Sequence, residues 1–257
     1  MAKRKISHRR HDRRHPATPR PEQAPDGLAW IYGTHAVEAA LDNPQRRRNR
    51  LVATAEAASR LRENFPSLKP EILDRAKLDA LLPEHAVHQG IALLAQPLQT
   101  TTIEDLLAGL GTQAIIVVLD RVSDPQNVGA VLRSAAAFKA IGIVVQDRGT
   151  PPSAGALTKT ASGALDILPL IRVANLVRAL DQLEDAGFWL IGFDGDAVLT
   201  LEDVPLNGRV ALVLGGEDRG LRRLTREACD HLVRIAAPGK LKTLNVSNAA
   251  AIALYEV

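Results

Sequence analysis

Three stretches of this 257-residue sequence place polar side chains and glycines directly after an apolar run. They are residues 119–135, 212–223 and 234–257. Their carboxamide, carboxylate, hydroxyl and guanidinium groups can orient a ligand by hydrogen bonds, and a guanidinium can also bind a phosphate. The single cysteine, Cys229, rules out an internal disulfide, and no Cys/His cluster has the spacing of a zinc site. We therefore expect chemistry without a metal.

The first stretch, residues 119–135, reads LDRVSDPQNVGAVLRSA. It leaves a predicted strand, and Pro125 favours an extended entry into a helix with Asn127 at the N-cap. Gly129 leaves room on the first helical turn for another backbone or a ligand, and Arg133 lies well inside the helix. The alternative to a functional site is helix capping plus a surface arginine.

The second stretch, residues 212–223, reads LVLGGEDRGLRR. It brings bare backbone amides and the carboxylate of Glu217 to a strand end. Its G-G-x-x-x-G spacing differs from the G-x-G-x-x-G dinucleotide fingerprint, which disfavours a nucleotide-dependent oxidoreductase. A tight turn between strand and helix is the alternative interpretation.

The third stretch, residues 234–257, reads RIAAPGKLKTLNVSNAAAIALYEV. Thr243, Asn245 and Ser247 precede an apolar helix, and each of them is a candidate cap. A single cap would be unremarkable. This many polar groups before an Ala-rich helix suit a helix that is buried against a ligand and a partner surface.

Alternating strands and helices connect these stretches. Apolar runs predict strands at 114–120, 141–147, 188–194, 209–216 and 231–237, with helices at 127–140, 175–187 and 221–229 between them. This alternation over residues 114–257 predicts an α/β sandwich on a parallel sheet, in which ligands bind at the carboxyl ends of the strands. A smaller α/β unit is predicted at 28–97, and a linker with a short helix at 98–113.

The charge of the chain is uneven. Residues 1–27 carry eight Lys and Arg against three acids, a net charge of +5, whereas the whole chain has +3. This tail has little to bury and is predicted to be disordered. Its composition favours an arm that binds nucleic acid by counterion release over a tail that only improves solubility. A second basic cluster consists of Arg46, Arg47, Arg48 and Arg50.

The composition of the chain also predicts where in the cell the protein is found. No apolar run reaches the ~18 residues that a membrane span requires, so no membrane partner is expected. No apolar segment follows the basic start, so we expect no secretory signal. With a single cysteine in the chain, we expect a cytoplasmic protein.

In this order and spacing, the three stretches resemble the three signature motifs of the SpoU, or TrmH, family of RNA ribose 2′-O-methyltransferases in the SPOUT superfamily. The resemblance covers nearly all of residues 28–257. The segments YGTHAVEAAL and HQGIALLAQPL resemble the L30e-like RNA-binding domain of the 23S rRNA guanosine 2′-O-methyltransferase subgroup. The resemblance implies a deep C-terminal trefoil knot, S-adenosylmethionine as methyl donor, and an obligate homodimer that uses the last helix.

The resemblance also assigns roles to individual residues. The catalytic positions are Asn127, Arg133, Glu217, Thr243 and Asn245. The donor contacts fall on Gly215, Ile235 and Leu244, largely through the backbone. Two positions depart from the usual family sequence, because Thr243 replaces a serine and Asp166 replaces the more frequent, longer glutamate.

The implied reaction is attack of a ribose 2′-hydroxyl on a sulfonium methyl group. A guanidinium with a pKa above ~12 is a poor base, so we expect Arg133 to bind the adjacent phosphate and orient the hydroxyl. The implied substrate is a guanosine of 23S rRNA. Two alternatives stay open, a tRNA 2′-O-methyltransferase of the same family and a non-catalytic RNA-binding factor for ribosome assembly.

Overall fold

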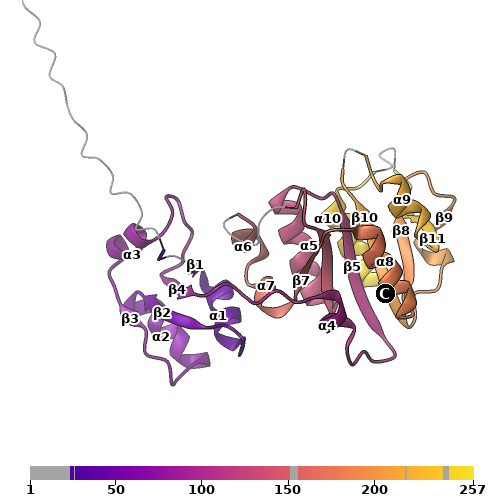
Figure 1. Cartoon of the computed structure of the whole chain (residues 1–257). Helices are drawn as coiled ribbons and strands as arrows, with labels where there is room; N and C mark the ends of the chain where they lie inside the picture. Colours follow the sequence, from indigo (N-terminus) through magenta and orange to yellow (C-terminus); the bar gives the residue numbers. More distant parts are fainter. Residues whose placement is uncertain (1–23, 26, 151–155, 218, 240–242) are drawn as a thin grey trace, which may run out of the picture.

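The computed structural model describes residues 24–25, 27–150, 156–217, 219–239 and 243–257. These residues form two units, each built on its own sheet and joined by an extended segment (Figure 1). We refer to residues 28–97 as the N-terminal unit and to residues 114–257 as the C-terminal unit. Nearly all of the predicted tail, residues 1–27, lies outside the described residues.

The N-terminal unit has a four-stranded mixed sheet in the order β1-β4-β2-β3. Its strands are β1 (Ala29–Tyr32), β2 (Arg48–Ala53), β3 (Glu71–Ile72) and β4 (Ile91–Ala95). Its helices are α1 (Thr34–Asp42), α2 (Ala55–Asn64) and α3 (Arg75–Leu81). The side chains of Thr54 and Asp74 cap α2 and α3, so local sequence sets where these two helices begin.

The C-terminal unit has a seven-stranded parallel sheet in the order β7-β6-β5-β10-β8-β11-β9. Its strands are β5 (Ala114–Asp120), β6 (Gly142–Gln146), β7 (Leu170–Val173), β8 (Trp189–Phe193), β9 (Leu199–Thr200), β10 (Arg209–Gly215) and β11 (His231–Arg234). The helices are α5 (Pro125–Ala137), α6 (Ala156–Ala161), α7 (Ala164–Ile167), α8 (Leu176–Asp185), α9 (Arg223–Glu227) and α10 (Val246–Glu256), with a 3-10 turn η1 (Leu201–Asp203). The predicted parallel α/β sandwich is confirmed.

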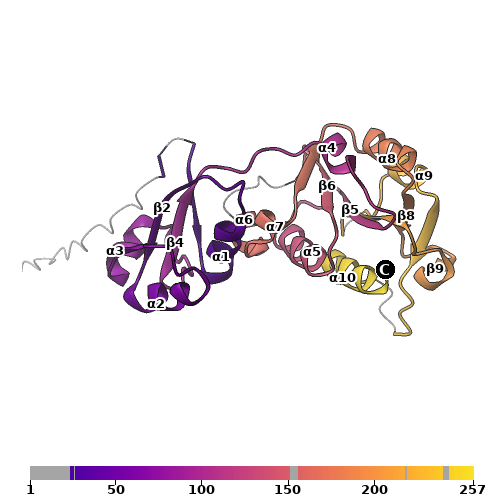
Figure 2. The ribbon, with the colours of Figure 1, turned by 90° about the horizontal axis from the view of Figure 1, so that it is seen from below.

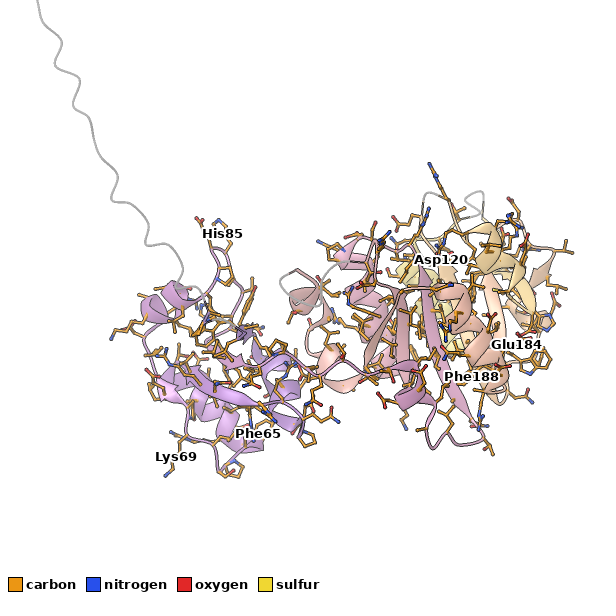
Figure 3. All side chains as sticks on the ribbon, in the orientation of Figure 1. Phe65, Lys69, His85, Asp120, Glu184 and Phe188 are labelled. Carbon is orange, nitrogen blue, oxygen red and sulfur yellow. The ribbon has the colours of Figure 1, made fainter. Side chains whose placement is uncertain are left out.

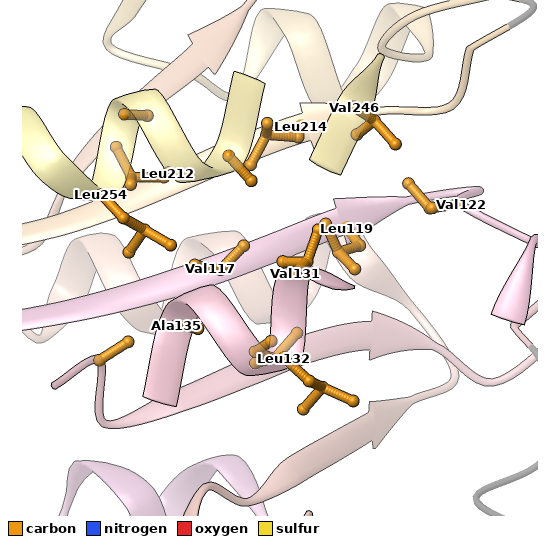
Figure 4. Close-up of a cluster of buried hydrophobic side chains, with 14 of the residues drawn as sticks. Val117, Leu119, Val122, Val131, Leu132, Ala135, Leu212, Leu214, Val246 and Leu254 are labelled. Carbon is orange, nitrogen blue, oxygen red and sulfur yellow. The ribbon is translucent and has the colours of Figure 1, made fainter. Parts of the chain in front are cut away.

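Helices cover both faces of this sheet, as Figure 2 shows. On one face, α5 and α10 pack together and bury a cluster that includes Val117, Leu132 and Leu254 (Figure 4). On the other face, α8 packs with α4 (Ile103–Leu107), a helix that lies in the connecting segment. Burial on both faces explains why β5 and β10 read as continuous apolar runs.

Several elements escaped the sequence analysis. No strand was predicted at β1 (AWIY) or at β7 (LIRV), although both segments are largely apolar. Both are short edge strands of four residues, paired on one side only. The trefoil knot depends on the path of the chain near residues 240–242, which lie outside the described residues, so it stays a prediction. Within the described part of the chain, no helix is long and apolar enough to cross a bilayer.

Gly129 on α5 provides a test of the helix packing. A Cβ at this position would lie 2.5 Å from the Cβ of Thr160 on α6. We predict that Gly129→Ala lowers the free energy of unfolding by about 1–3 kcal/mol through overpacking, although alanine is the better helix former. Urea denaturation measures the change. The control is Gly111→Ala, whose nearest atom is 3.9 Å away, and equal stability of the two variants would contradict this packing argument.

Candidate active site

Three side chains from distant parts of the chain meet in a hydrogen-bonded triangle. The Asn127 Nδ2 donates to Glu217 Oε1 at 2.8 Å. The Asn245 Nδ2 donates to Asn127 Oδ1 at 3.1 Å and to Glu217 Oε1 at 2.5 Å. We call Asn127, Glu217 and Asn245 the polar triangle. Each of the three polar stretches found in the sequence contributes one member.

Asn127 reaches the triangle from the first turn of α5. The sequence analysis placed it at the N-cap, and that prediction is wrong: Asp124 is the N-cap, and its side chain accepts a hydrogen bond from the backbone N–H of Gln126. Pro125 is the first helical residue, a position that suits proline because its missing N–H has no helical partner there. The Asn127 side chain is therefore free to cross to Glu217, and only 8% of the residue is exposed.

Asn245 is the N-cap of α10, as one of the candidate caps predicted there. Its Oδ1 accepts from the backbone N–H of Ser247 at 2.8 Å and from the Ser247 hydroxyl at 2.6 Å. With the oxygen used in this way, the Nδ2 group of Asn245 points its two protons at Asn127 and Glu217. The cap thus fixes the amide orientation that the triangle requires.

A buried ion pair anchors the loop that carries Glu217. Asp120 ends β5 and is 0% exposed (labelled in Figure 3). Its carboxylate accepts from the Arg222 Nε at 2.6 Å and from the Arg222 backbone N–H at 2.9 Å. Its backbone oxygen accepts from the N–H of Gly216 at 2.9 Å. Both ends of the 216–222 loop are therefore tied to the last residue of β5.

Gly215 has no room for a side chain, because the backbone of the same loop packs directly against it. A Cβ at this position would lie 2.1 Å from the carbonyl carbon of Gly220, and a Cβ at Gly216 would lie 2.6 Å from the carbonyl oxygen of Arg121. The loop folds back on its own strand end, so any side chain at residue 215 would open it. The contacts of Gly215 agree with a tight turn, which was the alternative interpretation of this stretch; the predicted donor contact of Gly215 stays a prediction.

The structure places the other predicted residues outside the triangle. Arg133 is exposed on α5, and no described residue forms a hydrogen bond or ion pair with its side chain. Arg133 lies six positions after Asn127, which amounts to about 9 Å along the helix and a different face. Thr243 and Leu244 are exposed just before α10, and Ile235 is half-buried directly after β11. None of these four has a polar side-chain contact with the triangle.

The side chains gathered at the site are hydrogen-bonding groups. Among the described residues, no group of three or more His, Cys, Asp or Glu side chains could hold a metal ion. Burial raises the pKa of the Cys229 thiol to about 12, with a further contribution from the carboxylates of Asp230 and Asp120. This thiol therefore stays protonated at neutral pH and supplies no nucleophile.

Residues 114–255 match the family model described as the SpoU rRNA Methylase family, and residues 30–101 match RNA 2′-O ribose methyltransferase substrate binding. The chain belongs to the SpoU rRNA methylase family. The resemblance drawn from the three polar stretches is confirmed.

Similar proteins cover most of the chain. An uncharacterized tRNA/rRNA methyltransferase of Synechocystis is 37% identical over 94% of this chain, and the match spans 66% of that protein. The 23S rRNA (guanosine-2′-O-)-methyltransferase RlmB of Xylella fastidiosa is 39% identical over 88% of this chain and 94% of its own length. The crystal structure of the SpoU methyltransferase AviRb of Streptomyces viridochromogenes with the cofactor AdoMet is 23% identical, covers 90% of this chain and 89% of its own, and has a TM-score of 0.73. At 23% identity, the structural similarity is evidence for the fold alone.

The ion pair between Asp120 and Arg222 was missed by the sequence analysis. An aspartate at the end of a strand that is buried on both faces was a usable signal, because a buried carboxylate requires a partner. Nothing in the pattern LRR selects Arg222 over Arg223 as that partner. The choice depends on the fold of the loop.

Removing the partner of Asp120 should destabilise the protein. We expect Arg222→Ala to lower the free energy of unfolding by about 3–5 kcal/mol, because it leaves a buried carboxylate without its counter-charge. Arg223→Ala is the matched control, since Arg223 pairs with Glu227 at the surface, and it should change stability by about 0–1 kcal/mol. Urea denaturation of both variants decides the matter, and similar losses for the two would contradict the anchoring role.

Proposed function

We propose that this chain is an S-adenosylmethionine-dependent RNA ribose 2′-O-methyltransferase that acts on a guanosine of 23S rRNA. The observation that carries the proposal is the polar triangle at the carboxyl ends of β5 and β10, where ligands of parallel α/β sheets bind. Family membership and the RlmB relatives support the reaction and the substrate.

The methyl donor would lie beside the β10 end and the segment between β11 and α10. Gly215, Ile235 and Leu244 are the proposed contacts, as the family motifs imply. The 41% exposed Leu244 and the half-buried Ile235 offer apolar surface close to backbone polar groups, which fits a ligand that has both apolar and polar parts. When bound, the donor supplies an electrophilic methyl group.

The residues of the chain would orient the ribose and its phosphate. The polar triangle offers amide protons and a carboxylate to sugar hydroxyls, and its mutual hydrogen bonds preorganise these groups. Arg133 is exposed and has no partner among the described residues, so its guanidinium is available to bind the phosphate next to the target ribose. Thr243, at the mouth of α10, would contact the same ribose.

We further propose that the protein is a cytoplasmic homodimer. Large apolar side chains are exposed at the C-terminal ends of α5 and α10, where Ile252 and Phe138 are each 39% exposed and Tyr255 is 74% exposed. The rings of Phe138 and Tyr255 meet edge to face, with centroids 6.2 Å apart. Large apolar side chains gathered on two adjacent helices are typical of a protein interface. A second copy of the chain is the proposed partner.

The decisive test of the proposed function is a map of ribose methylation. We expect a strain that lacks this protein to lose one 2′-O-methylguanosine of 23S rRNA, and a plasmid copy of the gene to restore it. Loss of a tRNA modification would instead select the tRNA alternative. An unchanged map, together with retained RNA binding, would select the non-catalytic binding factor.

Arg133 should act on the RNA and not on the donor. We expect Arg133→Ala to lower the single-turnover methylation rate at least a hundredfold and to leave the donor Kd, measured by calorimetry, within about twofold. Arg133→Lys keeps the charge but not the planar fork, so it should recover little activity. If Arg133→Ala abolished donor binding, the assignment to the RNA side would be wrong.

The apolar surface of α10 should control the oligomeric state. We predict that Ile252→Asp converts the dimer into a monomer, because it places a charge in the centre of the proposed interface. Analytical ultracentrifugation at micromolar concentration measures the change. Asp181→Asn on the distant helix α8 is the control. A wild-type protein that sediments as a monomer would refute the dimer.

A further inference from the structure

The two units face each other across a cleft of about 1730 Å³. The strands β1 and β7 line this cleft, and each is an edge strand of its own sheet. The two sheets are therefore not continuous. Direct contact between the units borders the same cleft, where α1 touches α7 and α6 touches β1. The angle between the units depends on those contacts and on the connecting segment.

A desolvated ion pair crosses this junction. The carboxylate of Asp166 on α7 is 4% exposed and accepts hydrogen bonds from the Arg46 Nε at 2.7 Å and the Asn43 Nδ2 at 3.1 Å. The Arg46 side chain is 8% exposed, and its Nη1 donates to the carbonyl oxygen of Gln96 at 2.8 Å. One guanidinium of the N-terminal unit thus binds both Asp166 of the C-terminal unit and the backbone just after β4 in its own unit. We call Asp166 and Arg46 the interunit clamp.

Backbone contact beside the clamp permits little movement. Gly163 precedes α7 with a φ of +89°, and a Cβ there would lie 2.8 Å from the Cβ of Ala39 and 2.9 Å from the carbonyl oxygen of His35. Helix α1 therefore rests directly on the backbone of the turn between α6 and α7. The hydrogen bonds of the clamp have defined directions. Next to this backbone contact, they restrict the orientation of the two units as well as the distance between them.

The junction also leads directly to the proposed active site. Helix α6 packs against α5 at Gly129, where Thr160 fills the space of the missing side chain. Gly129 lies two residues after Asn127 and four residues before Arg133. Close contacts therefore run from α1 to the turn at Gly163, and from the adjoining α6 to the helix that carries both site residues.

We propose that the interunit clamp is a positioning device for the RNA substrate. It holds the N-terminal unit at the angle at which RNA bound to that unit presents its ribose to α5. This inference rests on the proposed methyltransferase function. Asp166 and Arg46 are positioning residues, because they act through the orientation of the units and not on the reacting atoms.

The orientation itself is testable without any activity. Spin labels at Glu63→Cys on α2 and Asp185→Cys on α8, two exposed positions, report the distance between the units in a Cys229→Ser background. Labelled protein is diluted with unlabelled protein so that only distances within one chain are measured. We expect one narrow distance distribution, and at least a twofold broader one in the double variant Arg46→Met/Asp166→Leu. This variant removes both charges, so it leaves no buried charge without its partner.

The matched control removes an ion pair inside one unit. Arg50 donates two hydrogen bonds to Glu71, from Nε at 2.8 Å and from Nη2 at 3.0 Å, between β2 and β3. The double variant Arg50→Met/Glu71→Leu should keep the narrow distribution. If the clamp variant does not unfold cooperatively, Arg46→Lys replaces it. The lysine keeps the charge but cannot form both bonds, so a smaller broadening is expected.

Activity measurements complete the test. With 23S rRNA transcribed in vitro, the clamp variant should methylate at least tenfold more slowly at saturating RNA, while the Kd values for S-adenosylmethionine and RNA stay within twofold of the wild-type values. A distance distribution as narrow as in the wild type, or an unchanged rate, would overturn the proposal. If the wild-type protein methylates no RNA, the proposed function fails, and the distance measurement alone still decides whether the clamp fixes the two units.

Discussion

The buried carboxylate of Asp120 is the constraint on which the candidate site depends. It lies at the end of β5, opposite Gly215 in the register with β10, and it is shielded from water. A charge in such a place needs a partner with good hydrogen-bond geometry. Arg222 provides it, and the chain between Gly216 and Arg222 must therefore fold back over the strand ends. Glu217 reaches the other two members of the triangle only from that folded loop.

The polar triangle is also held by the apolar core beneath it. Asn127 is followed in the chain by Val128, which is 0% exposed, and Asn245 is followed by Val246, which is 5% exposed. Each polar residue thus adjoins a residue whose place is set by packing between α5, α10 and the sheet. This arrangement joins hydrophobic burial to site geometry, because a shift of either helix would separate amide groups that now lie within hydrogen-bond distance.

The sequence was informative where one physical effect dominates. Burial on both faces of the sheet produced the apolar runs of β5 and β10, and the polar segments at strand ends marked the loops that supply the triangle. The sequence pattern gave wrong predictions where several residues could fill the same structural role. Asn127 has the chemistry of an N-cap, but Asp124 and Pro125 already start the helix. The sequence grouped Arg46, Arg47, Arg48 and Arg50 as a basic cluster, but Arg46 and Arg50 are paired with Asp166 and Glu71. Those pairings depend on the path of the chain in three dimensions.

The hydrogen bonds of the triangle join residues that are 90, 118 and 28 positions apart in the chain. Contacts of such large sequence separation have a high loop-closure cost and generally form late in folding. They are also exposed to local unfolding, because detachment of α10 alone removes Asn245 from the other two residues. The competence of the site and the persistence of the sheet are therefore separate properties. A molecule in which α10 is detached would keep the pairing of its sheet and would lose the assembled site.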